Sequence, residues 1–148
     1  MAEGNGAIYN NFKEQVMEGI FDLSTGGDTL KMILVSGHTP NIDTHTVYAD
    51  VSADEYGAGS GYTVGGETLT GQDVIQDNTN DRGEFDANDV PWTSLGPLSP
   101  ATPSHCILYD DTPISPVAPL IAYWELGTTA TNGGDYTLQF GAAIIRLT

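Results

Sequence analysis

The apolar residues near the start of the chain recur with a helical period. In YNNFKEQVMEGIF, Phe12, Val16 and Ile20 are spaced four residues apart and share one face of a helix. Either asparagine of this segment can cap the helix N-terminus, and Gly19 can end it. The pattern therefore predicts a short helix from about Asn11 to Gly19 that packs through Phe12 and Val16. Three charged side chains should remain exposed: Lys13, Glu14 and Glu18.

Beyond the helix, short apolar or alternating runs are separated by clusters of turn-forming residues, a pattern typical of strands. Only a Thr-Gly pair separates the runs at 62–69 and 72–76, so we expect these two strands to be neighbours. The Asn-Gly-Gly segment at 132–134 predicts a hairpin between the strands on either side of it. The predicted strands are 29–35, 62–69, 72–76, 104–110, 119–127, 135–140 and 142–148.

The run at 119–127 has the clearest strand pattern of the C-terminal half. Simple alternation places Leu120, Ala122, Trp124 and Leu126 on one face of this strand and the residues between them on the other. We therefore expect Trp124 to be buried in the core.

Together these elements predict a mainly β protein, an antiparallel β-sandwich or jelly-roll-like barrel with one short N-terminal helix. The length of 148 residues is typical of a single domain, and we expect residues 9–148 to form one β domain. Residues 1–8 cannot fold alone. We expect them to form a flexible N-terminal arm that is either disordered or laid on a neighbouring subunit.

The chain is strongly acidic, with 20 Asp and Glu residues, 4 Lys and Arg residues and a net charge of −16. This charge repels phosphate, so we expect neither a nucleic acid nor an acidic membrane surface as a partner. No apolar run has the length of a membrane span, and the first residues lack the order of a signal peptide. These features predict a soluble protein that is made in the cytoplasm.

The stretch GSGYTVGG at 59–66 raises the question of a phosphate-binding loop. A dinucleotide loop has G-x-G-x-x-G between a strand and a helix, whereas Gly59, Gly61 and Gly65 are spaced one residue too widely and precede a strand-like segment. A Walker loop needs a Gly-Lys pair, and no lysine follows Lys31. We therefore predict that these glycines shape turns and bends rather than bind a ligand.

Candidate nucleophiles lack the sequence context that catalysis requires. Ser36 is two residues from His38, but no motif around them indicates a catalytic triad. Cys106 follows His105 in a predicted strand, so their side chains should point to opposite faces, with Cys106 buried. We therefore predict no catalytic residue and expect that the protein is not an enzyme.

The histidines and acidic residues match no metal-binding motif. His38, His45 and His105 occur without C-x-x-C or H-E-x-x-H. The segment DNTNDRGEFDAND at 77–89 offers several oxygens to a structural cation, but its glycine falls too late for an EF-hand loop, and Asx-turns on an acidic edge are the favoured interpretation. The adjacent carboxylates Asp54-Glu55 and Asp110-Asp111 say nothing about distances across a site. We predict no metal and no cofactor.

Several segments in a fixed order resemble a group of small tailed-phage proteins that are encoded among the virion structural genes. The segments are YNNFKEQVMEGIFDLSTGGDTLKMILVS, TPNIDTHTVYADVSADE, GSGYTVGGETL, QDNTNDRGEFDANDVPW, CILYDDT, SPVAPLIAYWELG and GDYTLQFGAAIIRL. The resemblance extends from Tyr9 to Leu147, and it rests on order and spacing rather than on one motif. Phe140-Gly141 stands where family members often have Trp-Asn.

The resemblance implies a virion structural protein, in particular a head decoration (cement) protein on the outer surface of the head. Its expected partners are the major capsid protein and further copies of itself, with a trimer favoured. It implies no catalytic residue. The alternatives are a tail-associated protein and a carbohydrate-binding module that would use Trp92 and Trp124 as stacking platforms, although core packing is the favoured interpretation of both tryptophans.

Overall fold

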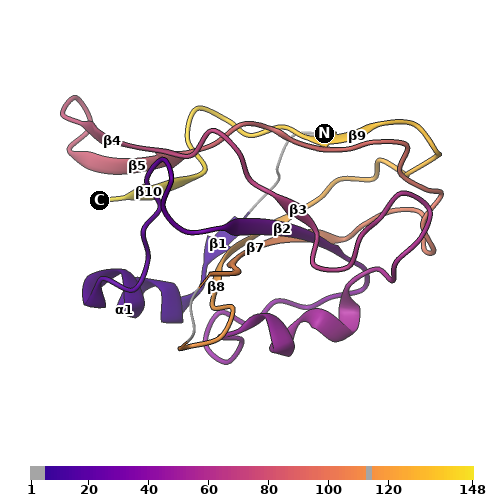
Figure 1. The fold of residues 1–148 in the computed structure, drawn as a ribbon, viewed down its shortest axis with the longest axis horizontal. Coiled ribbons are helices and arrows are strands. Elements are labelled where there is room, and N and C mark those ends of the chain that lie inside the picture. Colours follow the sequence, from indigo (N-terminus) through magenta and orange to yellow (C-terminus); the bar gives the residue numbers. More distant parts are fainter. Residues whose placement is uncertain (1–5, 113–114) are drawn as a thin grey trace.

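The computed structural model describes residues 6–112 and 115–148, and it shows a mainly β protein with antiparallel sheets and one α-helix (Figure 1). The predicted fold class is therefore confirmed. The helical elements are α1 (Asn10–Glu18) and two short 3-10 helices, η1 (Tyr48–Asp50) and η2 (Ser52–Asp54). The strands are β1 (Gly6–Ile8), β2 (Leu30–Val35), β3 (Glu67–Thr68), β4 (Asp73–Asp77), β5 (Arg82–Asp86), β6 (Val90–Trp92), β7 (His105–Asp110), β8 (Leu120–Glu125), β9 (Tyr136–Leu138) and β10 (Ile145–Leu147).

A five-stranded antiparallel sheet, ordered β1-β8-β7-β2-β3, forms the centre of the molecule. Its middle strands are buried on both faces because each alternates between two separate apolar clusters. Leu34 of β2 and Cys106 of β7 face the larger cluster, whereas Ile33 and Ile107 face the smaller one. This two-sided burial explains why β2 and β7 are almost continuously apolar in sequence.

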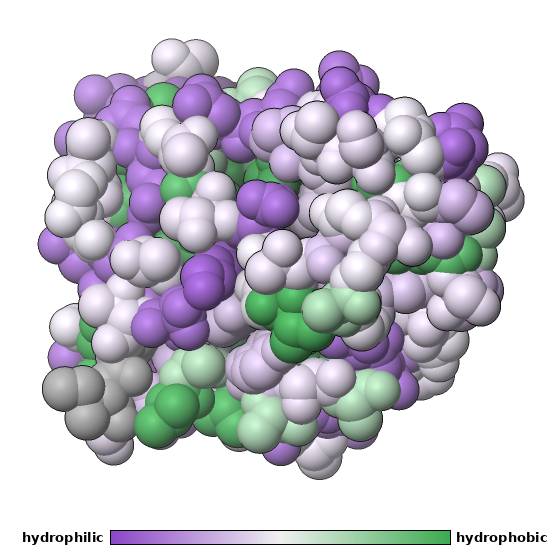
Figure 2. Space-filling view, turned by 45° about the vertical axis from the view of Figure 1, so that its right-hand side comes forward, coloured by the Kyte–Doolittle hydropathy of each residue, from purple (hydrophilic) through white to green (hydrophobic). Residues whose placement is uncertain are grey.

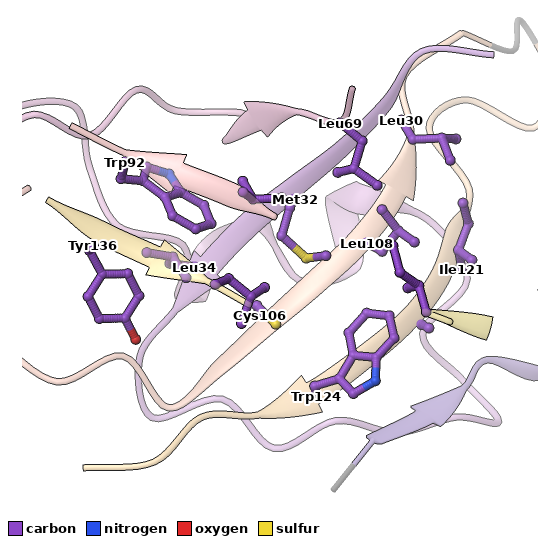
Figure 3. Close-up of a cluster of buried hydrophobic side chains, with 14 of the residues drawn as sticks. Leu30, Met32, Leu34, Leu69, Trp92, Cys106, Leu108, Ile121, Trp124 and Tyr136 are labelled. Carbon is purple, nitrogen blue, oxygen red and sulfur yellow. The ribbon is translucent and has the colours of Figure 1, made fainter. Parts of the chain in front are cut away.

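Two smaller sheets cover the larger cluster and give a sandwich-like arrangement, with no closed barrel among the described strands. They are ordered β10-β5-β4 and β6-β9. Side chains of β6 and β9, including Trp92 and Tyr136, meet those of β2, β7 and β8 in the shared core (Figure 3). At one end of the molecule, the β4–β5 hairpin projects beyond the central sheet (Figure 1).

Helix α1 follows the sequence expectation at its C-terminus but not at its N-terminus. Gly19 ends the helix with a φ of 73°, a conformation that glycine adopts at no steric cost. The N-cap residue is Tyr9, which makes no side-chain cap, and Asn11 is instead buried inside the helix. Its Nδ2 donates to the carbonyl oxygens of Thr46 and Leu120, at 3.0 and 2.9 Å. No helix within the described ranges is long and apolar enough to span a membrane.

Residues 6–8 do not belong to a flexible arm, so this part of the expected arm is wrong. They form β1, which pairs with β8 and sets Gly6 opposite Trp124. A Cβ at Gly6 would lie 2.3 Å from Trp124 Cδ1 and 2.5 Å from the Tyr123 carbonyl oxygen, so only glycine fits here. Residues 1–5 of the expected arm lie outside the described residues.

Several strand pairings also differ from the sequence expectation. The runs at 62–69 and 72–76 are not neighbours, because β3 pairs with β2 and β4 pairs with β5. Strands β5 and β6 lie in segments where the sequence patterns predicted no strand. The Asn-Gly-Gly segment at 132–134 does not join paired strands, since β8 pairs with β7 and β9 pairs with β6. It forms a turn in which the amide of Gly133 bonds to Leu95.

A β-bulge in β8 changes which side chains of this strand share a face. Leu108 of β7 is opposite Ala122, but Tyr109 is opposite Leu120, so Ile121 is an extra residue. Ile121 therefore joins Ala122 and Trp124 in the larger cluster, and Leu120 lies in the smaller one. The expected burial of Trp124 is confirmed, whereas the expected position of Leu120 on the same face is wrong.

Candidate interaction surface

Glycines of the 59–66 stretch turn the chain against the central sheet. Gly59 and Tyr62 exchange backbone hydrogen bonds of 3.0 and 2.9 Å, which closes a tight turn. Gly66 has a φ of 73°, and an added Cβ would lie 2.0 Å from the Met32 carbonyl oxygen. These close contacts confirm that the glycines have a structural role, as the sequence predicted.

The carboxylate of Glu55 holds the same stretch in place. Glu55 Oε1 accepts hydrogen bonds of 2.8 Å from both the Tyr62 hydroxyl and the Gly65 amide, and Oε2 accepts one from the Tyr48 hydroxyl. Burial, reinforced by the charge of Glu55, raises the pKa of Tyr62, so this donor keeps its proton. The preceding residue, Asp54, binds His38 instead. The two neighbouring carboxylates therefore serve different structural networks.

The three histidines, which are distant in sequence, lie close together in the structure. The ring centroid of His38 is 5.3 Å from that of His45 and 6.2 Å from that of His105. His38 is buried, and its Nδ1 lies 2.6 Å from Asp54 Oδ2. Burial, and then the nearby His38, lowers the pKa of His105. Within residues 6–112 and 115–148, no group of three His, Cys, Asp or Glu residues could hold a metal ion.

The candidate nucleophiles are used in structural contacts. Cys106 is buried in the larger cluster, and His105 lies on the opposite face of β7 beside Tyr123, as the alternation predicted. The Ser104 hydroxyl contacts His105 Nδ1 at 3.1 Å and donates to the Val35 carbonyl oxygen at 3.1 Å. In the described part of the chain, no hydrogen bond joins Ser36 to His38.

The neighbouring carboxylates Asp110 and Asp111 lie in different environments. Asp110 is fully buried at the end of β7. Burial, opposed by a hydrogen bond from the Thr112 amide and reinforced by the charge of Asp28, raises the pKa of Asp110 to about 7. Asp111 is at the surface, where its Oδ2 lies 2.7 Å from Lys31 Nζ. The two side chains therefore do not form a carboxylate pair.

The acidic segment at 77–89 forms the turn and second strand of a hairpin. Oδ1 of Asp77 accepts hydrogen bonds from the amides of Thr79 and Asn80, at 3.0 and 3.2 Å, in the expected Asx-turn. Its Oδ2 lies 3.2 Å from Arg82 Nε. The hairpin thus uses this carboxylate for its own turn and ion pair.

The side of the hairpin that faces α1 is hollowed into an apolar groove of about 310 Å³. Three separate segments form its walls: the end of α1, the loop that follows it, and the β10-β5-β4 sheet. Gly83 has no side chain to fill the space, and a Cβ there would meet nothing within 4 Å. The apolar lining side chains are Val16, Phe21, Leu23, Val74, Phe85, Ile145 and Leu147.

The rim of this groove is an exposed strand edge. Strand β4 pairs only with β5 among the described strands, so its other edge has no backbone partner there. Val74 is 51% exposed and Leu147 on β10 is 40% exposed, and both line the groove; Ile75, on the other face of β4, is 46% exposed. On the face shown in Figure 2, hydrophobic residues occur in small patches among hydrophilic ones. The groove, the β4 edge and these three side chains together are called the hairpin surface below.

The hairpin surface is acidic as well as apolar. Its arginines are engaged internally, because Glu84 Oε1 lies 2.6 Å from Arg82 Nη2 and 3.2 Å from Arg146 Nε. Three acidic side chains around it have no ion pair among the described residues: Asp22, Asp73 and Asp81. A partner at this surface therefore needs apolar side chains and a positive rather than a negative charge.

Sequence reasoning missed the hairpin surface because its residues come from segments about 130 positions apart in the chain. The one available signal was the adjacent apolar pair in DVIQD, which breaks the alternation of a half-buried strand. Comparison of the chain with protein-family models, with curated proteins and with solved structures gives no match.

Proposed function

We propose that the chain is a structural protein of a phage virion, a decoration protein that binds the outer face of the head shell and stabilises it. The observation that carries the proposal is the hairpin surface, an exposed apolar groove beside a free strand edge on an acidic β domain. Exposed apolar surface of this kind marks interaction sites in proteins. The sequence resemblance to virion structural proteins supplies the kind of partner, the major capsid protein.

The charge of the chain supports a position outside the shell. With a net charge of −16, the protein repels packaged DNA, whose phosphates carry the same sign. It would be made in the host cytoplasm, fold by itself and then add to a shell that has already formed. Affinity between copies would come from buried apolar area, because electrostatic attraction between copies is absent.

The same charge bears on the oligomer, for which we propose a trimer at a symmetry axis of the shell. Copies around one axis bring like charges together, and salt shortens that repulsion to about 8–10 Å at physiological ionic strength. Self-association of the purified protein should therefore strengthen as salt rises from about 10 to about 150 mM. Sedimentation at several salt concentrations measures it, and weaker association at higher salt would contradict this expectation.

The carbohydrate-binding alternative receives no support from the tryptophans. Trp92 is 0% exposed and Trp124 is 8% exposed, so neither ring presents a face on which a sugar could stack. Both side chains belong to the larger cluster, as expected for core residues.

Binding to isolated virion parts tests the proposal. Folded protein is mixed with undecorated heads and, separately, with tails of the phage, and bound copies are located by electron microscopy. We expect saturable binding to heads, at repeated positions on the outer surface. Binding to tails alone would replace the decoration role by the tail-associated one. Binding to neither, with the protein still folded, would refute a virion role.

A further inference from the structure

Strand β4 is the longest edge strand among the described strands. It has five residues, whereas the other edge strands, β1, β3, β6, β9 and β10, have two or three. Proteins protect strand edges by keeping them short or by covering them, since an exposed edge offers free N–H and C=O groups to another chain. Strand β4 is neither short nor covered by another strand. Its charged residues, Asp73 and Asp77, are both acidic, and between them it carries exposed apolar side chains at Val74 and Ile75.

The apolar groove is continuous with this edge. Val74 lies on the strand edge and also lines the groove, and its cross-strand partner Phe85 lines it too. Because side chains alternate along a strand, an added strand beside β4 would direct every second side chain to the groove side of the sheet. Backbone pairing and burial of apolar side chains are the two components of strand addition in peptide recognition.

Charge disfavours a second copy of the chain as the occupant. If two β4 strands paired antiparallel around Ile75, Asp73 of one copy would lie opposite Asp77 of the other, and like charges placed opposite each other destabilise a sheet. The exposed Asp22, Asp73 and Asp81 instead favour a strand with positive charge next to its apolar residues.

We propose that the free edge of β4 takes up an extended segment of the shell protein as an additional strand, in which basic residues flank alternating apolar ones. An apolar side chain of that segment would occupy the groove next to Val74 and above Gly83. The inference rests on the proposed decoration function for the identity of the partner, but the site itself is defined by the fold.

A matched pair of variants tests the site on heads. Val74→Lys and Val64→Lys introduce the same change at side chains that are 51% and 52% exposed, but Val64 lies in a loop away from the hairpin surface. We expect Val74→Lys to weaken binding to undecorated heads by about tenfold or more, and Val64→Lys to leave it within about twofold of the parent. Gly83→Leu should weaken binding as Val74→Lys does, because its side chain fills the groove. If Val74→Lys and Gly83→Leu are both folded and bind undecorated heads as tightly as the parent does, the inference is overturned and the decoration role is left intact.

A peptide probe tests the site without heads, so failure of the inference can be distinguished from failure of the proposed function. The probe is a blocked peptide in which lysines flank alternating valine and threonine, and the matched control has proline at its centre, which prevents strand pairing. We expect the probe, but not the control, to slow backbone amide exchange within Asp73–Asp77. No protection of β4 at saturating peptide, or equal protection by the control, would overturn strand addition. Protection of β4 in a protein that binds no heads would retain the site and refute the decoration role.

Discussion

Strands β2 and β4 were both predicted from apolar residues but occupy opposite extremes of burial. Strand β2, LKMILV, lies inside the central sheet, and all five of its apolar side chains are fully buried. Strand β4, DVIQD, lies at the edge of a small sheet, and four of its five residues are exposed. An apolar run thus predicted a strand in both cases, but burial depended on whether other elements covered it.

The difference separates the stable part of the molecule from the part available to a partner. Both faces of β2 are covered, so its side chains contribute apolar burial to folding. Strand β4 leaves its apolar area in water, and this area can stabilise a complex instead. Regions with few buried contacts also open most readily, which suits a strand edge that accepts another chain.

Truncating a core side chain should give the largest effect on stability. Trp124→Ala should lower the free energy of unfolding by about 3–5 kcal/mol, because it leaves a cavity in the larger cluster and removes the surface against which β1 packs. Ile75→Ala on the hairpin should cost less than about 1 kcal/mol. Urea unfolding followed by fluorescence measures both, and equal costs would contradict the division into two regions.

Adding one methyl group to a glycine should sharpen the same contrast. Gly66→Ala should cost about 1–3 kcal/mol, since its φ is 73° and its Cβ would overlap the Met32 carbonyl oxygen in β2. Gly83→Ala should change stability by less than about 1 kcal/mol and in the stabilising direction, because the space beside it is open. Thermal unfolding of both variants is the measurement, and a larger loss for Gly83→Ala would reverse the assignment.

The buried Asp110 should make the stability of the central sheet depend on pH. Its folded-state pKa of about 7 lies above the ordinary value, so the folded protein holds this proton more tightly than the unfolded chain does. The stabilisation is complete below about pH 4 and is lost as the pH rises through about 7. Asp110→Asn should therefore match the parent near pH 4 and exceed its free energy of unfolding by up to about 4 kcal/mol at pH 8, since each unit of pKa difference corresponds to about 1.4 kcal/mol.

Asp111→Asn is the matched control for this prediction, because it removes the neighbouring surface carboxylate that pairs with Lys31. It should show no gain in stability between pH 4 and pH 8, since a surface ion pair contributes about 0–1 kcal/mol. Denaturant unfolding at several pH values gives the comparison. A constant difference between Asp110→Asn and the parent would exclude a raised pKa at this buried carboxyl.

Removing an ion pair from the hairpin should give the smallest effect. Arg146→Ala leaves Glu84 with its second partner, Arg82 Nη2, at 2.6 Å, and the Arg146 side chain is 41% exposed. The expected loss is below about 1 kcal/mol and should shrink as salt is added. A loss above about 2 kcal/mol in thermal unfolding would show that the hairpin contributes to global stability more than its exposure indicates.

The sequence by itself determined the features that depend on neighbouring residues. The spacing of Phe12 and Val16, with glycine at position 19, predicted α1, and nearly continuous apolar runs predicted β2, β7 and β8. The spacing of the 59–66 glycines excluded known phosphate loops, and strand alternation predicted opposite faces for His105 and Cys106. These patterns are local, because helix and strand periods act over a few residues.

Tertiary structure decided everything that depends on which distant segments meet. The pairing of β1 with β8, the bulge at Ile121 and the gathering of the three histidines all result from long-range contacts that no local period encodes. The hairpin surface is of the same kind: strand β4 is exposed because no further strand pairs with it, and its groove exists because α1 and Gly83 leave space uncovered. Strand propensity concerns one segment, whereas burial is a property of the elements packed around it.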